Sequence, residues 1–228
     1  MTDCKEGYYD EDIYRPGTKC VKEQKCGDKY CDRKAGFICD AKTSKCVCSR
    51  DDQQPRDGKC IDVVPIDLYL WVVRRNQNIY IYGPDFGNLN SAGTREIVNM
   101  FTDGVGKVYA GIPLGNSYVS SNVREIQNPA NRNPTWDKGL WVEFTAYFDK
   151  RNAPDDYAAW QNLVNTIKNR YNYSVGGTEL YINEYQLPWA CYENDCHKFA
   201  NCTETSPTSY TCICFKDYVD LDRTRPGR

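Results

Sequence analysis

Thirteen cysteines are the residues of this 228-residue chain that could do the most definite chemistry. Eight lie between Cys4 and Cys60, none lie in 61–190, and five lie between Cys191 and Cys214. Zinc sites need closely spaced thiolate pairs with His, but the chain has one His and no CxxC pair. We therefore predict disulfides and no metal or other cofactor. Small segments that cannot bury enough apolar surface depend on disulfides in oxidising compartments.

Composition excludes several classes of protein. The net charge is −2 and no basic stripe suits a phosphate backbone, so no nucleic-acid partner is predicted. The apolar stretch 68–73 is far shorter than the ~20 residues that a membrane span needs. No secretory signal follows Met1. Since disulfides require secretion, we expect a piece of a longer protein, with any membrane contact through parts outside this chain.

The first complete set of cysteines runs C-x4-C-x7-C-x6-C-x-C-x11-C over residues 26–60. Spacing alone permits fifteen connectivities for six cysteines. The pattern resembles the epidermal-growth-factor-like (EGF-like) module, in which one C-x-C lies between the fourth and fifth cysteines. The resemblance implies first-to-third, second-to-fourth and fifth-to-sixth pairing. The implied pairs are Cys26–Cys39, Cys31–Cys46 and Cys48–Cys60.

The C-terminal cysteines begin the same pattern with five of its six members, and Tyr210 also fits it. The resemblance implies the pairs Cys191–Cys202 and Cys196–Cys212. Cys214 then has no partner in this chain, and a free reactive thiol is the alternative interpretation.

The two ends of the chain resemble each other. When Cys4 is placed on Cys214, four features coincide: Tyr8 with Tyr218, Asp10 with Asp220, Asp12 with Asp222, and Arg-Pro-Gly at 15–17 with 225–227. Both ends therefore look like the tail of such a module from its fifth cysteine onward, and Cys4 is expected to pair with Cys20. We predict a window from a tandem array. Its parts are a module stub (1–22), an EGF-like module (23–62), a central domain (66–187) and a module without its sixth cysteine (188–228).

Calcium-binding members of this family carry acidic residues before the first cysteine and Asp or Asn two residues after the third. Here VKEQK precedes Cys26 and QLPWA precedes Cys191. Ala41 and Glu204 stand two residues after the third cysteines. No calcium is therefore predicted.

The cysteine-free segment shows alternating strand and helix patterns. Strands are predicted at 67–75, 117–127, 140–149 and 178–186. Helices are predicted at 94–109, where Gly104 and Gly106 leave the second half open, and at 153–171, ending by Gly176-Gly177. Within 140–149, Leu140, Val142, Phe144, Ala146 and Phe148 face one side, and Trp141, Glu143, Thr145 and Tyr147 face the other. The second set is expected to form the outer face. Trp141 there could be a contact surface, but packing in the core or against a neighbouring cysteine module is the preferred interpretation.

The order strand, helix, strand, strand, helix, strand predicts an α+β, ferredoxin-like βαββαβ domain with both helices on one face of an antiparallel sheet. Between growth-factor-like modules, this domain resembles the SEA domain of cell-surface glycoproteins. Some SEA domains cleave themselves at a Gly-Ser bond between the second and third strands. At the matching position this chain has Gly139 and Leu140, and leucine has no nucleophilic atom, so we predict an intact domain.

Few other residues suggest a function. Asn172 and Asn201 begin N-glycosylation sequons, and we predict N-glycans on both. His197 is expected to be a loop histidine, since no nucleophile can be assigned near it. No catalytic set is present, so we predict no enzyme.

We predict an extracellular structural or adhesive segment with matrix or cell-surface protein partners. The arrangement is similar to nematode matrix receptors that tie epidermis to muscle or cuticle. A signalling ligand that docks one module into a receptor is the alternative.

Overall fold

The structure is a computed structural model that describes residues 4–5, 7–12, 14–15, 17–22, 25–133, 135–192, 194–221 and 224–228. The chain forms two compact units, Met1–Val64 and Pro65–Arg228. Pro16 and Asp222, which the comparison of the two ends uses, lie outside the described residues, as do residues 23 and 24 before Cys26.

The first unit consists of short antiparallel strand pairs: β1 (Tyr8–Asp10) with β2 (Cys20–Lys22), β3 (Phe37–Asp40) with β4 (Lys45–Cys48), and β5 (Gln53–Arg56) with the start of β6 (Lys59–Arg75). Two-stranded pairs of this size are marginal in water without further support. Four disulfides supply that support, as described below.

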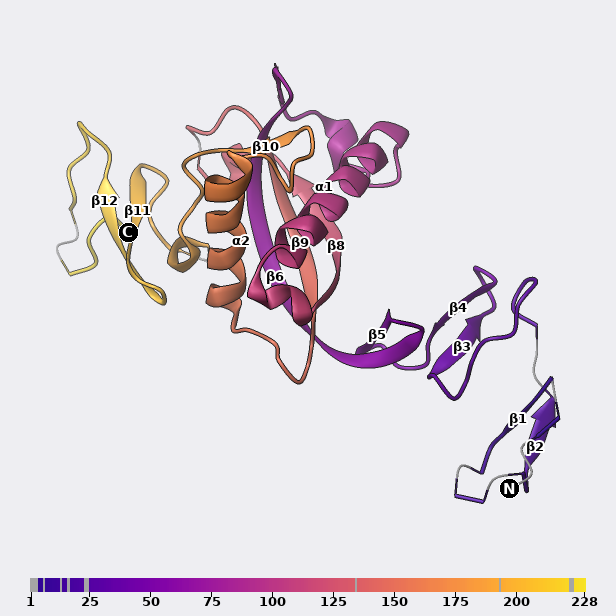
Figure 1. Ribbon diagram of the computed structural model, residues 1–228. Helices are drawn as coiled ribbons and strands as arrows, with labels where there is room; N and C mark the ends of the chain where they lie inside the picture. The colour runs from indigo at the N-terminus through magenta and orange to yellow at the C-terminus, as the bar shows by residue number, and fades with distance from the viewer. Residues whose placement is uncertain are drawn as a thin grey trace. The chain divides into compact units, whose positions relative to one another are not determined.

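The second unit is a mixed α/β structure that begins with the rest of β6. The sheet order is β10 (Leu180–Ile182), β6, β9 (Leu140–Asp149), β8 (Tyr118–Gln127), and β7 (Asn78–Ile79) pairs with the end of β6. Helices α1 (Ala92–Ala110) and α2 (Asp156–Tyr171) lie on one side of this sheet (Figure 1). Short 3-10 turns cover Pro84–Gly87, Pro113–Asn116, Pro129–Asn131 and Trp189–Cys191. The chain ends in the hairpin of β11 (Ala200–Ser206) and β12 (Ser209–Cys214).

Both predicted helices are present, and local residues set their ends. The Ser91 side chain accepts a hydrogen bond from the Thr94 amide at the start of α1, and Asp155 does the same for Ala158 at the start of α2. The second helix ends at Tyr171, as its predicted range does, but Gly176-Gly177 is not what ends it. Asn172 ends it in the left-handed conformation, with φ of 47°.

Gly104 lies inside a continuous α1, although its low helix propensity had left that half of the helix open. The reason is a close contact between α1 and the segment after α2. A Cβ at position 104 would lie 2.3 Å from the Val175 carbonyl oxygen, and one at Gly176 would lie 2.2 Å from the Gly104 carbonyl oxygen. Tertiary packing therefore outweighs the cost of glycine in the helix.

The core between the helices and the sheet is closely packed. The Phe101 ring of α1 meets Phe144 of β9 edge to face, with ring centroids 5.1 Å apart, and Tyr109 meets Phe148 in the same way at 5.2 Å. Burial of this apolar surface is the main stabilising contribution to the domain. Other buried members are Leu68, Leu70, Val72, Val105, Val108, Leu140, Val142, Leu163 and Ile167.

Two strand predictions need correction. The second face of β9 was expected to be its outer face, but Trp141, Glu143 and Thr145 are buried, and only Tyr147 of that set is half-buried. The strand predicted at 178–186 ends at Ile182. Beyond it, the buried Gln186 side chain takes the place of a strand partner, because its amide group bonds both the Trp71 N–H and the Trp71 carbonyl, at 2.8 and 3.0 Å.

Candidate functional site: the aromatic joint and the C-terminal disulfide module

Six disulfides hold the cysteine-rich ends of the chain. The first unit contains Cys4–Cys20, Cys26–Cys39, Cys31–Cys46 and Cys48–Cys60, and the second contains Cys191–Cys202 and Cys196–Cys212. Cys214 is half-buried and is the free cysteine of the described residues.

The sulfur atoms of Cys26, Cys31 and Cys46 lie within 4.8 Å of one another, a spacing that could suggest a metal site. All three are in disulfides, so they offer no thiolate ligand. In both modules, two cysteines face each other across a hairpin without bonding each other: Cys39 opposite Cys46, and Cys202 opposite Cys212. Each instead bonds a cysteine outside the hairpin, which ties the preceding loop to it.

Five aromatic rings from the sheet, from α2 and from the segment after the sheet pack together in a group that we call the aromatic joint: Tyr69, Trp141, Trp160, Trp189 and Tyr192. Tyr69 of β6 lies at its centre. Its ring stacks on Trp141 at 4.8 Å, on Tyr192 at 4.6 Å and on Trp189 at 5.8 Å between centroids. Trp160 of α2 completes the group at 5.7 Å from Tyr69. Residues about 120 positions apart in the chain are thereby packed together.

Tyr69 also makes polar contacts to the segment that leads into the C-terminal module. Its hydroxyl lies 2.9 Å from the Leu187 carbonyl and 3.0 Å from the Pro188 carbonyl, to which it donates. The side chain has no exposed surface, and burial raises the pKa of the Tyr69 phenol well above its ordinary value. The hydroxyl therefore keeps its proton, and its donor role, throughout the physiological range.

A part-buried ion pair lies beside the joint. Glu143 of β9 accepts a hydrogen bond from the Trp141 indole at 3.1 Å and pairs with Arg132. The Arg132 guanidinium lies over two joint rings, 5.5 Å from the centre of Trp141 and 5.1 Å from that of Tyr192. Such a cation over aromatic faces gains electrostatic energy while it covers apolar surface. The loop before β9 is thereby fixed to the C-terminal module.

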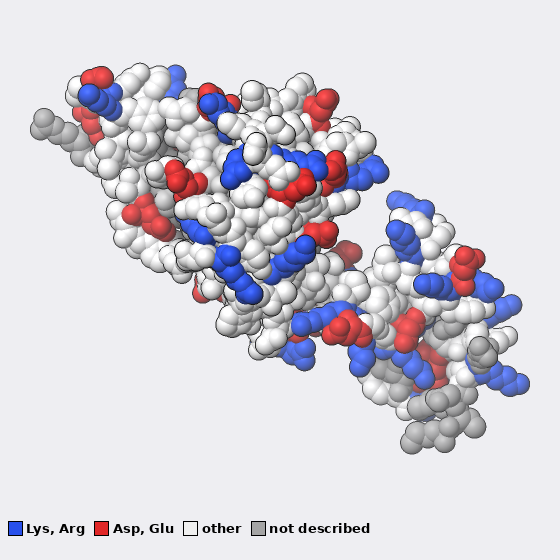
Figure 2. Space-filling model, turned by 45° about the horizontal axis from the view of Figure 1, so that its top comes forward, with Lys and Arg blue, Asp and Glu red and all other residues white. Residues whose placement is uncertain are grey.

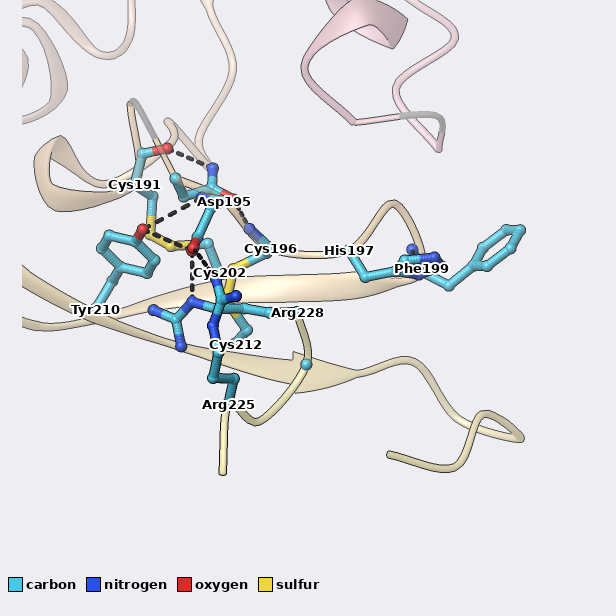
Figure 3. Close-up of a disulfide and its surroundings, with 12 residues drawn as sticks. Cys191, Asp195, Cys196, His197, Phe199, Cys202, Tyr210, Cys212, Arg225 and Arg228 are labelled. Atoms are coloured by element: carbon cyan, nitrogen blue, oxygen red, sulfur yellow. Dashed lines mark hydrogen bonds and ion pairs between the residues drawn. A yellow bond between two sulfur atoms is a disulfide. The ribbon is translucent and has the colours of Figure 1, made fainter. Parts of the chain in front are cut away.

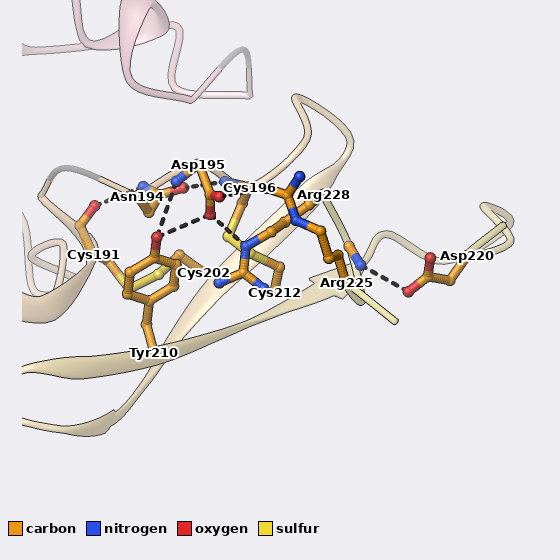
Figure 4. A network of polar contacts seen from close by, with 11 residues as sticks. Cys191, Asn194, Asp195, Cys196, Cys202, Tyr210, Cys212, Asp220, Arg225 and Arg228 are labelled. Carbon is orange, nitrogen blue, oxygen red and sulfur yellow. Dashed lines mark hydrogen bonds and ion pairs between the residues drawn. A yellow bond between two sulfur atoms is a disulfide. The ribbon is translucent and has the colours of Figure 1, made fainter. Parts of the chain in front are cut away.

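A second network holds the C-terminal module together internally. The Asp195 carboxylate accepts hydrogen bonds from the Tyr210 hydroxyl at 2.9 Å, from Arg225 at 3.1 Å and from Arg228 (Figures 3 and 4). The Arg228 hydrogen bond, followed by that of Tyr210, lowers the pKa of Asp195. These contacts fasten residues 225–228 to the loop between Cys191 and Cys196.

The related segments at the two ends share a further detail. The Asp220 carboxylate accepts from the Gly227 amide at 2.7 Å (Figure 4), and Asp10 accepts from the Gly17 amide seven residues on in the same way. Both glycines have positive φ, 69° and 83°, which an L side chain rarely adopts. The match found between the two ends of the sequence therefore extends to their local structure.

The remaining predicted positions are spread over the molecule. Gly139 lies at the start of β9 with φ of 98°, and a Cβ there would lie 2.5 Å from the Trp71 indole nitrogen. Leu140 is fully buried. Asn172 is exposed at the end of α2, and Asn201 is exposed on β11. His197 is exposed, and its ring points away from the Asp195 network (Figure 3).

The structure does not gather these predicted positions into one site. Sequence patterns missed the aromatic joint because alternation in 140–149 marks two faces without saying what covers the second. The signal that could have found it is segment 66–72, in which every residue except Asp67 is apolar and is also buried. A strand buried on both faces needs a partner on each.

Surface charge does not mark a separate site on the face that Figure 2 displays. There, Lys and Arg side chains are interspersed with Asp and Glu. Among the described residues, no helix combines the length and apolar character required to cross a membrane.

Comparison with known proteins gives a similarity that extends over nearly the whole chain. No family model matches the sequence. The chain is 29% identical over 225 residues to the transmembrane cell adhesion receptor mua-3 of Caenorhabditis elegans. The match includes 96% of this chain but only 6% of that receptor. This chain is thus similar, almost from end to end, to a small part of a large cell adhesion receptor.

Proposed function

We propose that this chain is an extracellular structural and adhesive segment of a cell-surface or matrix protein. The observation that carries the proposal is the similarity to a cell adhesion receptor over 96% of the chain. A match of that extent must include most of both cysteine-rich ends as well as the α/β domain between them. Six disulfides support the extracellular placement, because such bonds persist in oxidising compartments.

The proposal assigns EGF-like identity to the cysteine-rich parts, with boundaries at 1–22, 23–62 and 188–228. Three of the six disulfides support it, since they join first to third, second to fourth and fifth to sixth cysteines in the module at 26–60. Calcium plays no part in the proposal, because Ala41 and Glu204 stand where the calcium pattern needs Asp or Asn.

The proposal further assigns residues 66–187 to a non-cleaving, ferredoxin-like SEA domain. Its support is the βαββαβ order, in which each helix connects two strands that have another strand between them in the sheet. Gly139 and Leu140 lie at the end of the β8–β9 connection, where SEA cleavage would occur, and the leucine has no nucleophilic atom. No catalytic role is proposed. Mass spectrometry of the secreted chain should give one polypeptide, with N-glycans on Asn172 and Asn201, and fragments meeting at Gly139 would refute this part.

The geometry suits a segment that bears load. The aromatic joint and the Arg132–Glu143 pair attach the C-terminal module to the α/β domain, and disulfides limit how far each cysteine-rich loop can extend. Partners would be matrix or cell-surface proteins.

Cell attachment tests the proposal. Surfaces coated with the oxidised chain should retain epidermal or muscle cells under flow. Surfaces coated with reduced and alkylated chain, which keeps the same sequence, should not. Equal retention on both coatings would contradict an adhesive role for the folded segment. Receptor phosphorylation in the cells without attachment would instead support a soluble signalling ligand.

A further inference from the structure

The large exposed apolar residues of the α/β domain lie on two segments, each of which contributes a residue to the lining of one cavity. Within the described part of 65–187, the large hydrophobic side chains that reach solvent are Ile79, Ile81 and Tyr185, exposed by 57%, 73% and 75%. Ile79 lines a cavity of about 310 Å³, together with Trp71, Trp136 and others. Single exposed hydrophobic residues need no explanation, but a cluster beside a cavity indicates a contact surface.

The exposed residues lie close in sequence to lining residues of this cavity. Ile79 is on β7, which pairs with the end of β6, and Ile81 follows two positions later. Tyr185 follows two positions after Asn183, a lining residue whose side chain accepts a hydrogen bond from the Tyr185 amide at 2.8 Å. We call the cavity together with these three residues the Trp136 pocket.

The floor of the Trp136 pocket is already in place. The Trp136 ring stacks on Trp71 with centroids 4.3 Å apart. The Trp71 indole donates to the Lys138 carbonyl at 2.9 Å, and the Trp71 carbonyl accepts from the Asn183 amide at 2.8 Å. A ligand would therefore meet a rigid aromatic surface, which keeps the entropic cost of binding low.

The charges around the pocket are unbalanced. Arg74 and Lys138 line it, and neither has a carboxylate partner among the described residues. The Arg74 guanidinium instead stacks on the Tyr181 ring at 3.7 Å. By contrast, the adjacent Arg75 is paired with both Glu96 and Glu179. Asp137 is the one acidic residue of the lining, so the pocket carries an excess of one positive charge.

We propose that the Trp136 pocket binds a segment of a partner protein that inserts a bulky apolar side chain beside Trp136 and places a neighbouring carboxylate near Lys138 and Arg74. Apolar burial would supply most of the affinity, and the carboxylate would select the sequence. The proposal rests on the adhesive function and names the chemistry of its partner.

The test uses the full oxidised chain and short blocked peptides as probes. Acetyl-Gly-Phe-Glu-Gly-amide is compared with the same peptide carrying Lys for Glu, or Ala for Phe. Binding is followed by NMR at the indole N–H signals of Trp71 and Trp136, with the other tryptophans as internal controls. We expect the Phe-Glu peptide to bind about fivefold more tightly than the Phe-Lys peptide, the upper range for an exposed ion pair. The Ala peptide should produce no shift.

Charge reversal separates the proposal from non-specific binding. Lys138→Glu should abolish or invert the preference for Glu over Lys. Lys150→Glu, an equally exposed lysine outside the pocket, should leave it unchanged. Neither lysine side chain makes a hydrogen bond or ion pair to the described residues, so both variants should fold.

Three results would overturn the proposal: no indole shift at millimolar peptide, a preference that survives Lys138→Glu, or self-association of the chain that Ile79→Asp abolishes. The last would make the pocket an interface between copies. Cell attachment distinguishes the two proposals. Attachment without peptide binding would refute the proposed role of the pocket and leave the adhesive function supported. Peptide binding without attachment would refute the adhesive function and leave the pocket as a binding site.

Discussion

Replacement of Tyr69 by Phe isolates one part of the aromatic joint. The variant keeps the ring and its stacking on Trp141 and Tyr192, and removes only the hydroxyl that donates to the Leu187 and Pro188 carbonyls. A hydrogen bond of this kind contributes about 1 kcal/mol, and the buried carbonyls left short of a donor cost about 1 kcal/mol more. We therefore expect about 1–2 kcal/mol less stability, or a fall in Tm of roughly 2–8 °C for a unit of this size.

Tyr109→Phe is the matched control. Tyr109 is equally buried, and its hydroxyl also bonds a backbone carbonyl, that of Ala159 at 3.0 Å, but it connects the two helices. Both variants should lose similar global stability. Amide hydrogen exchange in 187–192 should increase only in Tyr69→Phe, because only this change loosens the connection to the C-terminal module. Equal exchange in that segment for the two variants would refute the role given to the joint.

Two further predictions concern α1 and the C-terminal network. In thermal unfolding, Gly104→Ala should lower the free energy of unfolding of the domain by about 2 kcal/mol or more, since its Cβ would overlap the Val175 carbonyl. Gly93→Ala is the control, because the space around Gly93 is open, and it should leave that free energy unchanged or raise it by up to about 1 kcal/mol. The attachment of Arg228 to Asp195 should weaken as pH falls below 3.8 through the lowered pKa of Asp195. A group whose pKa is lowered by folding stabilises the fold above its ordinary pKa and loses that effect in acid. NMR titration of the Arg228 signals should show this change in the native chain and not in Asp195→Asn. The same pH-dependent change in both chains would count against the network.

Local patterns predict the elements of this chain better than their surroundings. Apolar spacing located both helices, because a 3.6-residue period reflects a single buried face. It also placed the end of α2 at residue 171, but not its cause, since the left-handed conformation of Asn172 depends on one residue and not on a period. The predicted strand at 178–186 was too long because the pattern cannot distinguish a paired backbone from the Gln186 side chain that bonds Trp71 in its place.

The aromatic joint was harder to predict because its members come from distant parts of the sequence. Alternation showed that Trp141 and Glu143 share a face of β9, but their partners Tyr192 and Arg132 have no fixed spacing from them. The preference for packing of Trp141 agrees with its burial against Tyr69, whose ring also stacks on Tyr192 of the C-terminal module. Even so, the outer-face assignment of Glu143 and Thr145 was wrong, because a polar residue can be buried once an ion pair or hydrogen bond satisfies it.

Single-molecule stretching of the oxidised chain between its two ends tests the load-bearing account most directly. We predict one discrete unfolding step from residues 66–187, with about 3.5 Å of extension per released residue less the folded length of the domain. Disulfide-closed loops should add length only after a reductant is supplied. Extension of the α/β domain without a discrete step, at forces that stretch an unfolded chain, would contradict the proposal that this segment carries tension.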